Sequence, residues 1–196
     1  QIKVLLFFHK NTHQMQDDLF NNDNMRKFLV DCKVDYQEKL SYPPVALSLG
    51  SKVLTTDNGN LVLPVPIGSY GNISMISAPA KTKKTFFVSL LTSAYLSGDN
   101  PYCGQIKGHR AERSVLHIDT EQGRWHSHRT FQNTFNVSRI NDSKKYHTFG
   151  LRSIGWKNRL PFIEYCLERY QDVGLLCIDG VADLILDPNN QEQSNE

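Results

Sequence analysis

The feature that most constrains the fold is an alternation of short apolar runs with longer helical patterns after residue 72. Strands alternating with helices of about ten or more residues are typical of βαβ crossovers. We therefore expect an α/β fold with a mainly parallel sheet that helices cover on both faces. The predicted strands are Ile73–Ile76, Ser114–Ile118, Tyr146–Leu151 and Gly174–Ile178, and the predicted helices are Lys84–Leu96, Gln122–Phe135 and Pro161–Tyr170.

The segments before this alternation predict two smaller parts. Residues 1–44 are mixed and polar, with helical spacing around Met25–Leu40, and we interpret them as an N-terminal appendage. From Val45 to Ile67, apolar runs are separated by glycines, prolines and an Asp-Asn-Gly turn, which predicts a small β-hairpin region. We expect the core to extend over residues 45–187, followed by a polar tail at 188–196.

Composition decides between broad classes of protein. With 39% hydrophobic and 21% charged residues in 196, the chain can bury a core without disulfides or metals. Its apolar runs are far shorter than the roughly 18 residues of a membrane span, so we expect a soluble protein. Its four cysteines form no Cys-x-x-Cys pair, which favours reduced thiols in the cytoplasm. Because residue 1 is Gln, we expect a fragment of a longer chain.

A lysine-rich turn joins the first strand of the alternation to the first helix. It reads Ser77-Ala78-Pro79-Ala80-Lys81-Thr82-Lys83-Lys84-Thr85. In a phosphate-binding loop, G-x-x-x-x-G-K-[ST], backbone amides at a helix N-terminus hold phosphates, the Lys reaches the outer phosphates and the hydroxyl binds magnesium. Here Ala78 and Lys83 occupy the two glycine positions. A lysine-rich surface turn before a helix is the alternative interpretation.

Two further strands deliver carboxylates at their carboxyl ends, where open α/β sheets bind ligands. Asp119 and Glu121 follow the run that begins at Ser114, and a carboxylate there can polarise a water for attack on a γ-phosphate. Capping of the next helix is the alternative for this pair. Asp179 ends an apolar run, as in a Walker B strand that holds magnesium, although an Asp also commonly begins a loop.

Taken together, these three elements resemble a RecA-fold ATPase of the RepA/DnaB/KaiC-like group, especially ATPases of bacterial mobile and conjugative elements. The resemblance covers about residues 45–187. It implies that ATP and Mg²⁺ bind between subunits of a homo-oligomer, with Lys84 on phosphate, Thr85 and Asp179 on Mg²⁺, and Glu121 activating water. The implied ATP-binding residues are Ala78, Pro79, Ala80, Lys81, Thr82, Lys83, Lys84, Thr85 and Phe86. Because family members normally continue with a further strand, we expect a core truncated at its C-terminus.

The resemblance and the charge distribution lead to two functional hypotheses. The first is an ATP-hydrolysing DNA-processing protein, helicase- or loader-like, of a mobile genetic element. The second is a non-hydrolysing nucleotide sensor or DNA-binding adaptor with a degenerate loop. Residues 107–159 hold 11 Lys+Arg and 4 Asp+Glu, a net charge of +7 against +2 for the whole chain, which indicates an anionic partner.

Within this basic stretch, we expect Arg139, Lys144 and Lys145 to contact the DNA backbone, with a solvated loop as the alternative. We expect Trp125 and Phe131 to pack in the core, because aromatic residues at helical spacing usually point inward.

Overall fold

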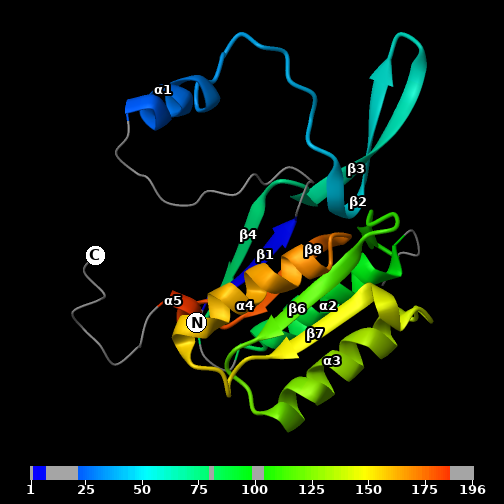
Figure 1. The fold of residues 1–196 in the computed structure, drawn as a ribbon. Helices are drawn as coiled ribbons and strands as arrows, with labels where there is room; N and C mark the ends of the chain where they lie inside the picture. The colour runs from blue at the N-terminus through cyan, green and yellow to red at the C-terminus, as the bar shows by residue number, and fades with distance from the viewer. Residues whose placement is uncertain (1, 8–21, 80–81, 99–103, 186–196) are drawn as a thin grey trace. The chain divides into compact units, whose positions relative to one another are not determined.

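The computed structural model describes residues 2–7, 22–79, 82–98 and 104–185 (Figure 1). The chain divides into two compact units, one formed by residues 10–43 and the other by residues 1–9 and 44–196. The smaller unit contains helix α1 (Asn22–Asp31), which begins and ends earlier than the helical spacing predicts. A turn follows it, closed by a hydrogen bond from the Glu38 amide to the Asp35 carbonyl.

The larger unit is built on a mixed five-stranded sheet, so the α/β expectation is confirmed. Its order is β4-β1-β8-β6-β7. Strands β8, β6 and β7 run parallel to one another, while β1 runs antiparallel to both of its neighbours. The strand bounds are β1 Ile2–Phe7, β4 Ile73–Ser77, β6 Ser114–Asp119, β7 Tyr146–Gly150 and β8 Val173–Asp179.

The boundary that the sequence predicts at residue 44 leaves strand β1 outside the core, whereas the structure places it in the sheet. Its residues pair with β4 on one side, as in Val4 with Met75, and with β8 on the other, as in Val4 with Ile178. The apolar run that begins the chain therefore belongs to the sheet, and the separate unit is confined to residues 10–43. The physical reason is that a continuous apolar run is also the pattern of a strand inside a sheet.

A second, antiparallel sheet has the order β3-β2-β5. The predicted hairpin is confirmed as β2 (Val45–Thr56) and β3 (Gly59–Ser69), and β5 (Ile106–Gly108) pairs with β2. Pro64 and Pro66 lie inside β3 instead of separating strands. Because β3 is an edge strand and its register shifts near these residues, proline costs the ladder little there.

Helices cover both faces of the large sheet, as predicted. Helix α2 packs on one face, with Val88 and Leu91 against Val115 and Leu175, while α4 packs on the other through Ile163. Among the described residues, no helix is both long and apolar enough to cross a membrane. The helix bounds are α2 Lys84–Ser97, α3 Arg124–Ser138, α4 Trp156–Arg169 and α5 Ala182–Ile185, with a 3₁₀ turn at Ser143–Lys145.

Two details of the helices differ from prediction. Helix α4 begins at Trp156, so Pro161 lies inside the helix and not at its start. Trp125 is 64% exposed, so its predicted place in the core is wrong. The face that α3 buries is formed by Ser127, Thr134 and Ser138, and Phe131 lies beside it with its ring 4.9 Å from that of His117.

Candidate functional site

The carboxyl ends of β4, β8, β6 and β7 form one row at a single edge of the sheet (Figure 1). Lys3 of β1 is the register partner of both Ile76 and Asp179, and Asp119 is the partner of both Asp179 and Gly150. The loop after β4, the acidic turn after β6 and Asp179 therefore lie at the same edge, as expected. Two strand spacings, roughly 10 Å, separate the ends of β4 and β8, because β1 lies between them.

The lysine-rich turn keeps the backbone shape that glycine usually supplies. Lys83 has φ 61° and ψ 31°, a left-handed conformation that costs a non-glycine residue about 1 kcal/mol. Helix α2 begins at the next residue, Lys84. Within the described residues, no side chain caps this helix N-terminus, and the sequence of its first turn has no acidic residue. The terminus therefore keeps the positive potential that attracts anions.

The Lys84 side chain folds back over the loop, and the residue as a whole is only 7% exposed. Its ammonium group donates hydrogen bonds to the carbonyl oxygens of Ala78, at 2.6 Å, and Pro79, at 2.8 Å. The Thr82 hydroxyl donates to the same Pro79 carbonyl at 2.7 Å. Lys84 thus carries a buried positive charge that closes the loop by bonding its first carbonyls.

The other predicted loop residues lie around this lysine or outside the described residues. Thr85 is half-buried in the first turn of α2, and the Phe86 side chain points outward with 72% of its surface exposed. Ala80 and Lys81 are outside the described residues.

Asp119 is the capping residue of the acidic turn. Its Oδ1 accepts hydrogen bonds from the amides of Glu121, at 3.0 Å, and Gln122, at 2.9 Å, and its Oδ2 accepts one from the Ser127 hydroxyl at 2.9 Å. Asp119 is 1% exposed, so both carboxylate oxygens are committed to holding the turn and the start of α3. Asp119 therefore holds the turn before α3, although none of the described side chains caps the N-terminus of that helix, and Glu121 remains the candidate base.

Glu121 lies against the residue that follows Asp179. Gly180 has φ 101°, and a Cβ added to it would come within 2.6 Å of Glu121 Cγ and 2.2 Å of the Thr120 hydroxyl oxygen. The Thr120 amide donates to the Asp179 carbonyl at 3.0 Å. Its hydroxyl lies 2.8 Å from the Gly180 carbonyl oxygen. The ends of β6 and β8 are thereby locked together with the Glu121 side chain against them.

Asp179 ends β8 with 2% of its surface exposed. A carboxylate oxygen from Asp179 and a hydroxyl oxygen from Thr85 are the hard donors that Mg²⁺ prefers, so these residue types fit a magnesium ion. No group of three or more His, Cys, Asp or Glu residues that could hold a metal occurs in the described part of the chain. A magnesium ion at this edge would therefore need phosphate oxygens or water as further ligands.

Gly180, Thr120 and Ser127 are site residues that sequence reasoning missed. The Asp-Gly pair at 179–180 was an available signal, because glycine directly after a buried strand often marks a close approach of another side chain. The hydroxyls of Thr120 and Ser127 carry no comparable signal, since isolated Ser and Thr residues cap turns throughout proteins.

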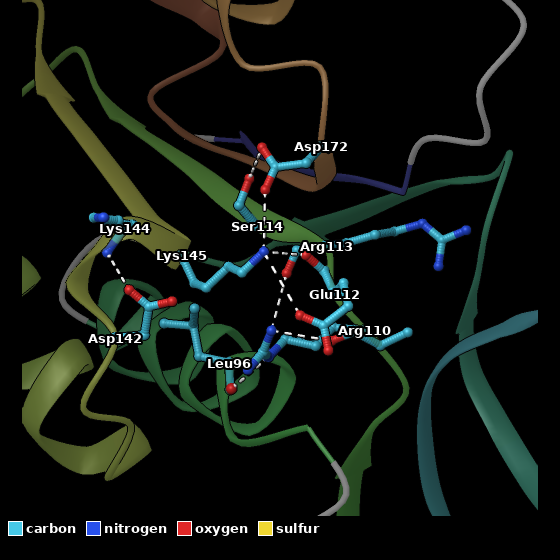
Figure 2. A network of polar contacts seen from close by, with 10 residues as sticks. Leu96, Arg110, Glu112, Arg113, Ser114, Asp142, Lys144, Lys145 and Asp172 are labelled. Atoms are coloured by element: carbon cyan, nitrogen blue, oxygen red, sulfur yellow. Dashed lines mark hydrogen bonds and ion pairs between the residues drawn. The ribbon is translucent and has the colours of Figure 1, made fainter.

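Of the predicted DNA-contacting residues, Lys144 and Lys145 lie near the opposite edge of the sheet, where β7 and β8 begin (Figure 2), while Arg139 is the C-cap of α3. The Lys145 ammonium lies 3.3 Å from an Asp172 carboxylate oxygen and also donates to the Glu112 carbonyl. Its side chain is only 20% exposed. Lys144 and Arg139 are exposed. The structure therefore separates all three from the loop and commits Lys145 to contacts within the chain.

The same edge holds a histidine whose pKa is perturbed. The His147 ring stacks on Tyr170 with ring centres 3.8 Å apart. Burial lowers the pKa of His147 below the ordinary value, while the charge of Asp172 opposes this shift.

Comparison with protein-family models, curated proteins and solved structures finds no match for this chain. The class that the fold itself defines is an α/β protein with three parallel strands, an antiparallel strand inside the same sheet and a separate antiparallel sheet.

Proposed function

We propose that this chain binds ATP with Mg²⁺ at the carboxyl edge of the sheet and hydrolyses it, as part of a RecA-like core. The observation that carries the proposal is the conformation of Lys83 and Lys84. Lys83 has a strained left-handed backbone, and the next residue, Lys84, bonds back to its own loop. A turn that only connects a strand to a helix gains nothing from this backbone strain. The strain is accounted for if the loop must present its amides and its ammonium to phosphates.

Each residue then has a definite task. The first amides of α2 bind phosphate oxygens, and the Lys84 ammonium exchanges its two carbonyl partners for the outer phosphates. The Thr85 hydroxyl and the Asp179 carboxylate hold Mg²⁺. When bound, Mg²⁺ neutralises the charge that develops on the phosphate oxygens.

Glu121 is the proposed general base. It follows Asp119 in the turn, and the two hydrogen bonds from the Glu121 and Gln122 amides to Asp119 fix the backbone that carries it. Its carboxylate orients a water for attack on the γ-phosphate and accepts a proton from it. Asp119 has no free oxygen for this task, because Ser127 and the two amides occupy its carboxylate.

A second candidate function rests on the residues at the two glycine positions. With Ala78 and Lys83 there, the side chains of the loop occupy space that glycine leaves to phosphate. A protein that binds nucleotide without hydrolysing it, acting as a sensor or a DNA-binding adaptor, tolerates such a loop more easily than an ATPase does.

DNA processing in a mobile element, assembly into a homo-oligomer and a cytoplasmic location complete the proposal. The net charge of +7 over residues 107–159 supports an anionic partner. The dispersed cysteines support a reducing compartment, and the buried Cys166 is a free thiol.

One pair of measurements on the whole chain separates these possibilities. Calorimetric titration with a non-hydrolysable ATP analogue and Mg²⁺ tests binding, and phosphate release from ATP tests hydrolysis. Binding together with phosphate release supports the ATPase. Binding without release supports the sensor or adaptor, and absence of binding contradicts both.

A further inference from the structure

Helix α3 presents an outward stripe of unusual composition. Residues three or four apart share a face of a helix, so Trp125, His128, Arg129, Gln132 and Asn136 lie on one line. All five are exposed, and none belongs to the buried face of the helix. We call these five residues the α3 stripe. It extends for roughly 16 Å along the helix axis.

The charge of α3 is entirely of one sign. The sequence Arg124–Ser138 contains two arginines, two histidines and no Asp or Glu, and Arg139 follows at the C-cap. The nearest preceding carboxylates, Asp119 and Glu121, are turned to other contacts, with Ser127 and Gly180 respectively. The surface of α3 therefore favours an anionic partner.

An indole ring lies at one end of this cationic surface. Trp125 is 64% exposed, and its ring lies 5.6 Å from the Arg129 guanidinium carbon. The ring of His126 contacts it edge-on at 4.9 Å. Arg124 and His126 flank Trp125 in the sequence, so the residues next to the indole along the chain are basic or polar.

We propose that the α3 stripe binds single-stranded nucleic acid, with an unpaired base stacked on Trp125 and phosphates held by Arg129 and the neighbouring cations. An exposed indole beside arginines supplies the two interactions that such binding requires, stacking and backbone charge. Paired bases offer no free ring face, so double-stranded DNA uses only the charges. The inference deepens the DNA-processing part of the proposed function, but its residues are separate from the nucleotide loop.

The test is fluorescence anisotropy of a labelled oligothymidylate with the whole chain, without nucleotide. The Trp125→Ala variant should bind about tenfold more weakly, the scale of one lost base stack, and Trp125→Phe should recover part of the loss. Tyr165→Ala is the matched control, because Tyr165 is 61% exposed on α4, which covers the other face of the sheet. It should bind as the wild type does.

The charge component is measured separately by salt dependence. Arg129→Ala should reduce the slope of log affinity against log salt by about 0.7, one phosphate contact on a single strand. Arg169→Ala, an exposed arginine in the last turn of α4, should leave the slope unchanged. In a Trp156→Phe background, Trp125 is the remaining tryptophan, and the oligonucleotide should quench its fluorescence.

Several outcomes overturn the proposal. The proposal is wrong if the wild-type protein binds no oligothymidylate at low salt. It is also wrong if Trp125→Ala and wild type bind with equal affinity, or if single and double strands are bound with equal affinity. A Trp125→Ala variant that changes the sedimentation of the protein but not its oligonucleotide affinity assigns the α3 stripe to contact between copies of the chain. Because no nucleotide is present, failure here leaves the ATP proposal standing, and failure of ATP binding leaves this one standing.

Discussion

Glu121 packs on Gly180 so closely that no side chain fits at position 180: an added Cβ would lie 2.6 Å from Glu121 Cγ. Gly180 also has φ 101°, where side chains are strained. This contact joins the candidate base to the end of the strand that carries Asp179. The candidate carboxylates of β6 and β8 are thus held by direct packing as well as by the register of the sheet.

Replacing Gly180 with Ala should therefore destabilise the protein by about 1–3 kcal/mol and displace Glu121. Urea unfolding measures the loss of stability. Gly155→Ala is the matched control, because Gly155 has φ −57° and no atom within 4 Å of an added Cβ. Equal stability of the two variants would contradict the close contact.

Replacing Lys84 with Ala should weaken binding of the ATP analogue at least tenfold, about 1.4 kcal/mol, because a charge-assisted phosphate contact is lost. Calorimetry checks this. Lys52→Ala, which removes an exposed lysine from the β-hairpin, should bind as the wild type does. If Lys84→Ala also binds equally well, the loop is not the nucleotide site.

The Glu121→Gln variant should lose phosphate release while keeping its affinity for ATP. The amide preserves the shape against Gly180 but cannot accept a proton from water. Phosphate release at equal rates from wild type and variant would assign the base to another residue.

Protonation of His147 should destabilise the fold. Burial holds the pKa of His147 below its unfolded value of about 6.5, so the unfolded chain takes up the proton more readily. Its contribution is therefore complete above about pH 6.5 and declines as the pH falls through that value. Urea unfolding at about pH 7.5 and about pH 5.5 should show a larger loss for wild type than for His147→Gln. Equal losses in the two proteins would show that His147 does not contribute.

The three predicted DNA-contacting residues should behave differently from one another. Arg139→Ala with Lys144→Ala should reduce the salt slope of DNA binding by up to about 2, one per phosphate contact. Lys145→Ala should instead lower stability, because it leaves Asp172 without its ion pair. An unchanged slope in the double variant would favour a merely solvated loop.

Periodicity was enough to predict four strands and three helices of the core, because short apolar runs alternate there with longer segments of helical spacing. It was not enough to place β1. A continuous apolar run predicts a strand that is buried on both faces of a sheet, but it does not predict which strands lie beside it. β1 pairs with β4 and β8, and both of these strands are separated from it in the sequence by far more residues than a usual loop contains.

The error at Trp125 has a different cause. The sequence was interpreted as an aromatic face on α3, whereas the face that packs inward is lined by Ser127, Thr134 and Ser138. Their hydroxyls all have acceptors: the Ser127 hydroxyl donates to the Asp119 carboxylate at 2.9 Å and the Thr134 hydroxyl to the Thr130 carbonyl at 2.8 Å, and the Ser138 hydroxyl donates to the Phe135 carbonyl. Small residues with satisfied hydroxyls let α2 and α3 pack closely, as in the bond from Ser93 to the Thr134 carbonyl. Hydrophobicity alone does not detect such a face.

Of the candidate site, the shared edge of the loop and the two acidic strands could be predicted, because parallel strands end together. The commitment of Asp119 to the turn could not be predicted, although the resemblance already implied that Glu121 activates the water. Both follow the same strand, and only the hydrogen bonds to the Asp119 carboxylate show which one is committed to the turn.

The position of β1 also determines the order in which this sheet can form. Leu5 pairs with Cys177, so the centre of the sheet joins two segments from nearly opposite ends of the sequence. Such pairing has a high contact order, and its loop-closure entropy must be overcome before the contact contributes any energy. During synthesis from the N-terminus, β1 and β4 are both made long before β8. The edge that carries the candidate site therefore becomes complete only after β8 has been made.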